Sequence, residues 1–329
     1  MLSQHEGLHY INGKLGMVNV ITLNGMKQSW REGNFDLKYF WAVFVAITAL
    51  ATSLMNALVV GAICKDPSRN LKTVPSNLLI ASQAIADFFV GLIHDPLCSW
   101  WILTFSSTAA HVIEAVSSLF LVASVLHVVA LSFDRYIAVW RPLSHHSVVT
   151  KKKVTIWCIV IWSYSCIYMA YRTVLRELNH PIVIINILSG THTILPSFIS
   201  VIFYIRIYFA LRNNRKRACV LDDSEQIVAN AYRRERNMTK AMMAVLGLFL
   251  LCITPWFLLY QVIGACPTCS EHTSVEMYLF AIFYYIFLLK SLLNPFLYAW
   301  RLPKFRSAFK IMLKTSRILR TDRIGTMTN

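Results

Sequence analysis

An acidic and a basic residue stand side by side at the end of a long apolar run, and no other feature of this sequence points as directly to chemistry. The run covers about residues 111–133, and Asp134, Arg135 and Tyr136 follow it. Such a length is typical of a helix that crosses a bilayer. A charge pair there is costly unless its members pair with each other or face the interior of a helix bundle. We therefore interpret Asp134-Arg135 as a functional site, the alternative being an arginine that extends to the lipid headgroups.

The composition indicates a membrane protein. The chain of 329 residues is 56% hydrophobic and only 15% charged, whereas soluble domains have roughly 25% charged residues. The net charge of +16 does not indicate nucleic acid binding, because the basic residues concentrate in a few loops and the tail. That distribution is typical of membrane topology and of contact with anionic inner-leaflet lipids. Residues 1–36 lack a basic start followed by an apolar core, so we expect the first span to act as its own signal anchor.

Seven apolar segments predict an all-α fold, a seven-transmembrane helix bundle. Each segment is long enough for the ~20 residues that a helix needs to cross the hydrocarbon. The prolines inside the fifth, sixth and seventh segments, Pro196, Pro255 and Pro295, are tolerated where neighbouring helices satisfy the freed backbone groups. The segments cover about residues 37–63, 74–98, 108–136, 154–174, 182–211, 238–264 and 275–299.

The basic residues predict the orientation of the chain. They lie in the loops after the first, third and fifth segments and in the tail, and the opposite loops contain only Arg176. The positive-inside rule then places the N-terminus outside and the C-terminus in the cytoplasm. We expect an extracellular tail over 1–36, the membrane domain over 37–299, an amphipathic helix on the inner membrane face over 300–314, and a disordered tail over 315–329. The alternative for 300–314 is a disordered basic segment.

Residues inside the segments carry a resemblance to a known family. Their order and spacing resemble those of the rhodopsin-like (class A) G-protein-coupled receptors over about residues 37–309. The matching positions are Asn56, Asn77, Asp87, Asp134, Arg135, Tyr136, Trp162, Pro196, Tyr204, Pro255, Asn294, Pro295 and Tyr298.

The resemblance implies a mechanism. In this family the arginine at Arg135 is held by Asp134 and by an acidic residue at the inner end of the sixth span, where Glu235 stands. Activation moves that span outward and opens a cleft for a heterotrimeric G protein, which Tyr204 and Tyr298 would line. Such a bundle has two states whose balance a ligand shifts. The alternative for Glu235 is an ordinary surface salt bridge within residues 233–236.

Several departures from the family pattern are informative. The family usually has a disulfide between the outer end of the third span and the second outside loop, but Ala110 stands at the first position and the loop 175–181 has no cysteine. Receptors of the melanocortin, cannabinoid and lysophospholipid type share this lack. The short second loop resembles the melanocortin receptors most, but Pro196 and Asn294 depart from their usual pattern, so the subfamily stays open. Cys266 and Cys269 lie in the third outside loop, where a local disulfide is plausible. A zinc site there needs two further ligands, and we expect neither a metal centre nor a cofactor.

The resemblance also locates the ligand pocket. Ser117 stands where amine receptors carry an aspartate, and Leu288 where light-sensing relatives carry the retinal lysine. Asp95 and Glu114 face the same outer third, where they could meet a cationic ligand group or a divalent ion. Alternatively, they pair with Arg172 or with His94 and His111. The aromatic candidates, which could equally be bundle packing, are Trp256, Phe257, Tyr260, Tyr284 and Tyr285.

Relatives in this family commonly hold a sodium ion beneath the ligand site. Asp87, Ser124, Ser291 and Asn294 match that cavity, but Lys290 stands where a neutral polar residue is usual. We expect the Lys290 ammonium to face Asp87 and to pair with it, because either group alone is costly in the bundle. The alternative is that Lys290 turns toward lipid.

We therefore predict a plasma-membrane receptor that transmits the binding of an extracellular ligand to a G protein, and not an enzyme. A transporter or channel is the alternative. It predicts internal repeats and polar stripes along several spans, which the sequence lacks. A seven-span enzyme predicts a metal-ligating cluster, and His94-Asp95 with His127 falls short of one because His127 lies deep in the third span.

Overall fold

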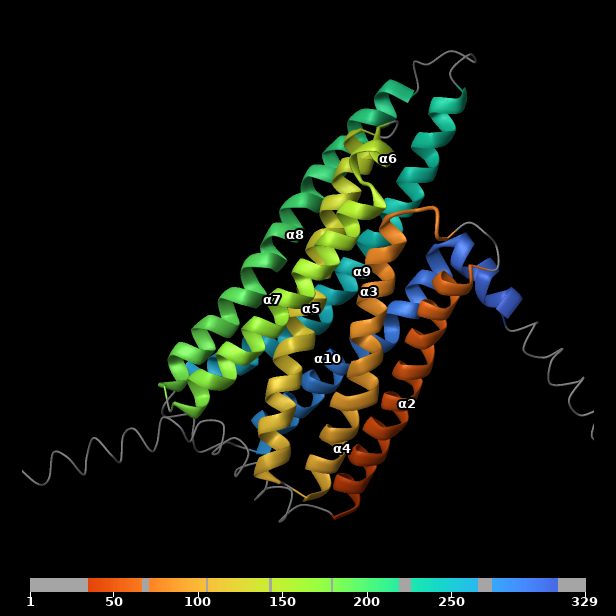
Figure 1. The fold of residues 1–329 in the computed structure, drawn as a ribbon. Coiled ribbons are helices and arrows are strands. Elements are labelled where there is room, and N and C mark those ends of the chain that lie inside the picture. The colour runs from red at the N-terminus through yellow and green to blue at the C-terminus, as the bar shows by residue number, and fades with distance from the viewer. Residues whose placement is uncertain are drawn as a thin grey trace, which may run out of the picture.

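The computed structural model describes residues 35–66, 71–104, 106–141, 144–178, 180–218, 226–265 and 274–312, and the regular structure in them is helical (Figure 1). Among these residues, seven helices are long and apolar enough to cross a membrane, which confirms the predicted bundle. The elements are α2 (Phe35–Lys65), α3 (Ser76–Phe89), η1 (Val90–His94), α4 (Asp95–Thr104), α5 (Ser107–Trp140), α6 (His145–Val148), α7 (Lys151–Glu177), α8 (Ile182–Ala218), α9 (Gln226–Ala265), α10 (Ser274–Arg301) and a last helix over 303–312.

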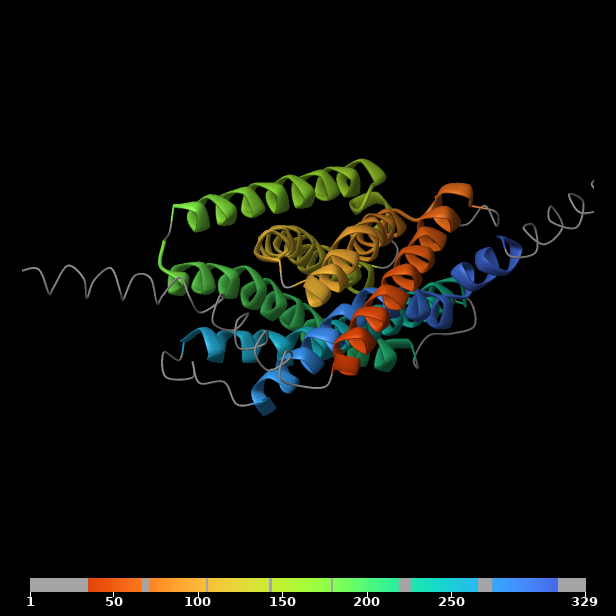
Figure 2. The same ribbon diagram turned by 90° about the horizontal axis from the view of Figure 1, so that it is seen from below.

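Helix α5 runs through the middle of the bundle. It contacts α3, α4, α7, α8 and α9, and the view along it shows these helices arranged around it (Figure 2). Its buried residues Val125, Val128 and Leu131 belong to the two apolar clusters that form the core. A side chain on α5 can therefore contact several other spans, and α5 carries both Ser117 and Arg135.

The outer surface of the bundle is apolar. Ile167 on α7 is 67% exposed and Leu251 on α9 is 72% exposed. A soluble protein rarely exposes large apolar side chains over contiguous areas. These side chains therefore fit a lipid environment, in agreement with the length and hydropathy of the helices.

The second span differs from the single helix predicted over 74–98. It consists of α3, the π-helical turn η1 and α4, and the backbone N–H of Asp95 donates to the carbonyl of Val90, five residues earlier. Pro96 has no N–H to donate to the carbonyl of Leu92, and its ring would clash with that carbonyl in an α-helix. A π-turn is one of the arrangements that accommodate such a disruption.

Helices α8 and α9 extend beyond the predicted segments. The segments were expected to end near residue 211 and to begin near residue 238, whereas α8 ends at Ala218 and α9 begins at Gln226. The prediction followed the apolar residues only. These helices continue into polar sequence, because a helix can extend beyond its apolar stretch.

The segment 303–312 forms a helix, inside the range predicted as amphipathic. Phe305 and Ala308 are buried against the inner core, and the guanidinium of Arg306 donates to the carbonyls of Ala299 and Trp300 at the end of α10. These bonds satisfy carbonyls that a helix end leaves without intrahelical partners. Residues 35 and 36 of the expected N-terminal tail belong to α2. The rest of that tail, the expected C-terminal tail, Cys266 and Cys269, and residues 313–314 lie outside the described residues.

Candidate functional site

The π-turn places His94 and Asp95 inside the bundle. An extra residue in one turn rotates every later side chain relative to an ideal α-helix, and π-turns are frequent at functional sites. His94 and Asp95 are 2% and 1% exposed. Gly91 allows the turn to approach α2 closely, because a Cβ at this position would lie 2.7 Å from the carbonyl oxygen of Ala49 and 2.7 Å from the amide nitrogen of Ser53.

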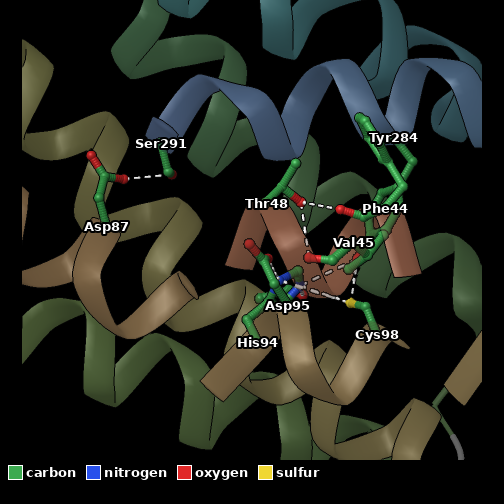
Figure 3. Close-up of polar contacts among 10 residues, drawn as sticks. Phe44, Val45, Thr48, Asp87, His94, Asp95, Cys98, Tyr284 and Ser291 are labelled. Carbon is green, nitrogen blue, oxygen red and sulfur yellow. Dashed lines mark hydrogen bonds and ion pairs between the residues drawn. The ribbon is translucent and has the colours of Figure 1, made fainter. Parts of the chain in front are cut away.

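His94 is the centre of a polar cluster that joins three spans, and Figure 3 shows His94, Asp95, Cys98 and Tyr284 of this cluster. Its Nδ1 lies 2.9 Å from Oδ1 of Asp95, and its Nε2 lies 2.7 Å from Oγ of Ser117 on α5. The hydroxyl of Tyr284 on α10 lies 3.2 Å from Nε2 of His94 and 3.1 Å from Sγ of Cys98. We call His94, Asp95, Cys98, Ser117 and Tyr284 the His94 cluster. A ligand that moves any one of these side chains changes the contacts of the others.

Glu114 is occupied by two arginines. Its Oε1 accepts from Nη2 of Arg172 at 2.6 Å, and Arg176 forms a second ion pair with its other oxygen. Both arginines are on α7, so the ion pairs of Glu114 link α5 to α7. The sequence left open whether Asp95 and Glu114 meet a cationic ligand or pair within the protein, and in this structure both carboxylates have internal partners.

Aromatic rings surround the cluster. Trp256 stacks on Phe287 with ring centroids 4.9 Å apart, and its indole lies 5.9 Å from the Tyr284 ring. Tyr285 stacks on Trp41 of α2 at 4.2 Å. The structure thus places Trp256 and Tyr284, two of the candidate ligand contacts, beside each other. The side chain of Tyr260, a third candidate, lies outside the described part of the chain.

The centre of the bundle contains Asp87 and Lys290. Oδ1 of Asp87 accepts from the Ser291 hydroxyl at 2.6 Å and Oδ2 accepts from the Asn294 amide at 2.8 Å, and the first of these bonds is visible in Figure 3. The Lys290 ammonium donates instead to Oγ of Ser124 at 3.1 Å. Among the described residues no ion pair joins Lys290 to Asp87 directly, so the expected direct pairing is wrong for this structure. The buried hydroxyl of Ser124 is the closer acceptor.

The C-terminal end of α5 has a second buried network. Nε of Arg135 donates to Oδ2 of Asp134 at 2.8 Å, and Nη2 donates to the Ser76 hydroxyl of α3 at 2.7 Å. The other oxygen of Asp134, Oδ1, lies 2.9 Å from Nε2 of His145 on α6. All four side chains are at most 2% exposed. The side chain of Glu235 lies outside the described part of the chain, so its expected contact with Arg135 stays a prediction.

The other expected switch residues lie on α5, α8 and α10. Tyr204 and Tyr298 are buried, and the Tyr136 ring packs 5.7 Å from Phe203 of α8. Pro295 is inside α10, one residue after Asn294. The cysteines expected to form a disulfide, Cys266 and Cys269, lie outside the described residues.

Comparisons with known proteins agree with this arrangement. The family model "7 transmembrane receptor (rhodopsin family)" matches residues 55–182 and 176–298. The chain belongs to this family of receptors. It is thus a G-protein-coupled receptor, and the transporter or channel alternative is not favoured.

Individual relatives are receptors for several kinds of ligand. The chain is 26% identical to a D(1)-like dopamine receptor of Oreochromis mossambicus over 92% of this chain and 85% of the relative. It is 27% identical to the melanocortin receptor 5 of Mus musculus, over 82% and 83% respectively. It is 24% identical to the 5-hydroxytryptamine receptor 1B of Equus caballus, over 84% and 86%. The melanocortin match agrees with the short second loop and the missing cysteine at Ala110.

Three residues of these networks were not predicted from the sequence. Cys98 is a lone cysteine in an apolar run, Ser76 is one of many serines, and His145 lies in a loop ten residues after Arg135. None of these positions shows a sequence pattern that distinguishes a network member from ordinary packing. His94 was predicted only as one alternative partner of Asp95.

Proposed function

We propose that the ligand acts on the His94 cluster and that Asp134 and Arg135 form the switch for the G protein. What carries the proposal is that both networks include a side chain of α5, Ser117 in one and Arg135 in the other. These residues are 18 positions apart, or roughly 27 Å along a helix at 1.5 Å per residue. A ligand that repositions the outer end of α5 relative to α4 and α10 can therefore bias the inner network through one rigid element.

The ligand chemistry we propose follows from the charges. Asp95 is bonded to His94, and Glu114 to Arg172 and Arg176, so each carboxylate already has a partner inside the protein. A ligand ammonium would have to displace the buried His94 or the half-buried arginines from these carboxylates, which costs desolvation free energy. We therefore propose a ligand without an essential cationic amine. Its oxygen accepts from the Tyr284 hydroxyl in place of the Cys98 sulfur, which is a weak acceptor.

The orientation and the membrane contacts belong to the same proposal. The basic loops and tail support an extracellular N-terminus and a cytoplasmic Arg135 network in the plasma membrane. Exposed basic residues such as Lys310 on the helix 303–312 support contact with anionic lipids of the inner leaflet. Epitope tags at either terminus, stained in intact and permeabilised cells, test the orientation. Staining of an N-terminal tag only after permeabilisation would reverse it.

The experiment is nucleotide exchange on a panel of purified heterotrimeric G proteins by the receptor in lipid nanodiscs. Monoamines, peptides and neutral oxygen-bearing lipids are compared as ligands. We expect exchange to respond to a compound without a cationic amine. A monoamine agonist whose potency requires its ammonium would contradict the proposed chemistry while leaving G-protein coupling intact.

The Tyr284 hydroxyl provides the matched variants. Tyr284→Phe removes the proposed donor, and we expect roughly tenfold lower agonist potency, the size of one hydrogen bond. Tyr285→Phe removes the hydroxyl of a neighbouring tyrosine, whose ring stacks on Trp41. We expect this variant to change agonist potency little. Equal effects of the two substitutions would show that the Tyr284 hydroxyl does not contact the ligand.

A further inference from the structure

Lys290 is a charged residue in the core that takes no part in the proposed ligand binding or G-protein coupling. It is 3% exposed, and its ammonium donates to Ser124 at 3.1 Å. The same nitrogen lies 5.2 Å from the ring centroid of Phe249 and 5.2 Å from that of Phe287. Aromatic faces attract a cation at this distance. The ammonium is therefore held in a defined place between α5, α9 and α10, and does not turn toward lipid.

Asp87 is the negative charge that matches this ammonium. Both of its oxygens accept hydrogen bonds, but the donors, Ser291 and Asn294, are neutral. Ser291 and Asn294 thus orient the carboxylate of Asp87 but do not neutralise its charge. A buried carboxylate needs a counter-charge, which can act across several ångströms because the interior screens charges weakly. Lys290, adjacent to Ser291 in the chain, provides that charge without touching the carboxylate.

The residues present do not fit the sodium ion that the family resemblance implies. Sodium, a hard cation like Ca²⁺ and Mg²⁺, needs several oxygen atoms with free lone pairs directed at it. Here each Asp87 oxygen keeps one lone pair beside its bond from Ser291 or Asn294, but the Ser124 oxygen already accepts from the Lys290 ammonium, which occupies the position beside it. A second cation in this space would also be repelled by the ammonium.

We propose that Lys290 is the resident cation of this core, covalently attached to α10, and that it closes the core to monovalent metal ions. The ammonium balances Asp87 in every salt solution, so the receptor does not respond to sodium. It also connects Ser124 of α5 to Phe249 of α9. The span that the family moves during activation, α9, is thus linked to α5 through a charge that cannot dissociate. This inference depends on the core alone and stands whether or not the proposed ligand chemistry is correct.

Thermal unfolding of the purified receptor in nanodiscs tests the proposal without a ligand or a G protein. The unfolding midpoint is measured in sodium chloride and in choline chloride at equal ionic strength. For the unmodified chain we expect the same midpoint in both salts. Lys290→Asn removes the ammonium and supplies a carbonyl oxygen, and we expect its midpoint to rise with sodium by roughly 2–4 °C in a saturable manner.

Two control variants test whether the sodium response of Lys290→Asn arises at the site of Lys290 and Asp87. Lys290→Arg keeps the charge, so its midpoint should stay the same in both salts. In the double variant Lys290→Asn with Asp87→Asn the sodium response should disappear. A saturable, sodium-specific rise in the unmodified chain would overturn the proposal, and so would a folded Lys290→Asn variant that does not respond to sodium. If Lys290→Asn does not fold, the sodium-23 resonance is measured with the unmodified receptor and with Asp87→Asn. Line broadening by the unmodified receptor that Asp87→Asn abolishes would overturn the proposal.

Discussion

His145 and Arg135 both bond to the carboxylate of Asp134. Its Nε2 lies 2.9 Å from Oδ1 of Asp134, while Arg135 donates to the other oxygen. Because these side chains are buried, water cannot replace a lost partner without rearrangement. The loop that contains α6 therefore helps to keep the arginine in place, together with the Ser76 hydroxyl of α3.

Removing the imidazole should release this restraint. We expect His145→Leu, which fills a similar volume without a donor, to raise agonist-free nucleotide exchange by roughly threefold to tenfold, the net size of one ordinary hydrogen bond. His145→Gln should behave like the unmodified receptor, because its amide nitrogen occupies the place of Nε2. The measurement is exchange on a reconstituted G protein at matched receptor amount.

The controls for His145 distinguish the hydrogen bond from the loop itself. Ser147 is exposed and bonds only within its loop, to the carbonyl of Ser144, so Ser147→Ala should leave basal exchange unchanged. The effect of His145→Leu should also vanish in an Asp134→Asn background, since the restrained charge is then gone. An additive effect in that background would mean that His145 acts on folding and not through Asp134.

Arg135 itself should be required for coupling. We expect Arg135→Ala to abolish nucleotide exchange and to leave surface expression largely intact, because the arginine is the buried cation that becomes available to the G protein when the network opens. Arg206→Ala, which changes an exposed arginine on α8, is the matched control. Normal agonist-driven exchange by Arg135→Ala would remove the central residue of the proposed switch.

Glu235 tests whether α9 carries a second restraint on Arg135. If its carboxylate pairs with the arginine, Glu235→Ala removes a partly buried partner and favours the open bundle by about 1–2 kcal/mol, roughly half the cost of breaking a fully buried pair. Basal exchange should then rise. Combined with His145→Leu, it should rise further, because the two restraints act from different elements. Basal exchange that stays constant would make Glu235 an ordinary surface charge.

The sequence predicts the bundle well because the relevant signal is long and repeated. Each span is an apolar run of sufficient length, and a charge pair such as Asp134-Arg135 at the end of one run is conspicuous. The partners of these charges are harder to predict. The contact of His145 depends on where a four-residue helix folds back onto α5, which no local pattern encodes. Likewise, whether Lys290 donates to Asp87 or to Ser124 depends on side-chain geometry inside the bundle.

The π-turn was missed for a different reason. It differs from an α-helix by one residue per turn, and hydrophobic periodicity over a span of 29 residues does not resolve such a change. Pro96 was the available signal, since a proline inside a span disturbs the preceding turn. The consequence is large, because the turn determines which way His94 and Asp95 point.

The close contact at Gly91 makes the position of this turn testable. Gly91→Ala places a methyl group 2.7 Å from backbone atoms of α2, the carbonyl oxygen of Ala49 and the amide nitrogen of Ser53. Backbone cannot rotate away, so α2 and η1 must separate. We expect a loss of about 1–3 kcal/mol in stability, typical of overpacking, seen as a lower unfolding midpoint.

Gly247 on α9 is the matched control, because a Cβ there meets no atom within 4 Å. Gly247→Ala should leave stability unchanged or raise it by about 0.5–1 kcal/mol, the usual gain inside a helix. Since Gly91→Ala also displaces the turn before His94, it should weaken the response to an agonist more than Gly247→Ala does. A Gly91→Ala receptor as stable and as responsive as the Gly247→Ala receptor would show that the contact between α2 and η1 does not position the His94 cluster.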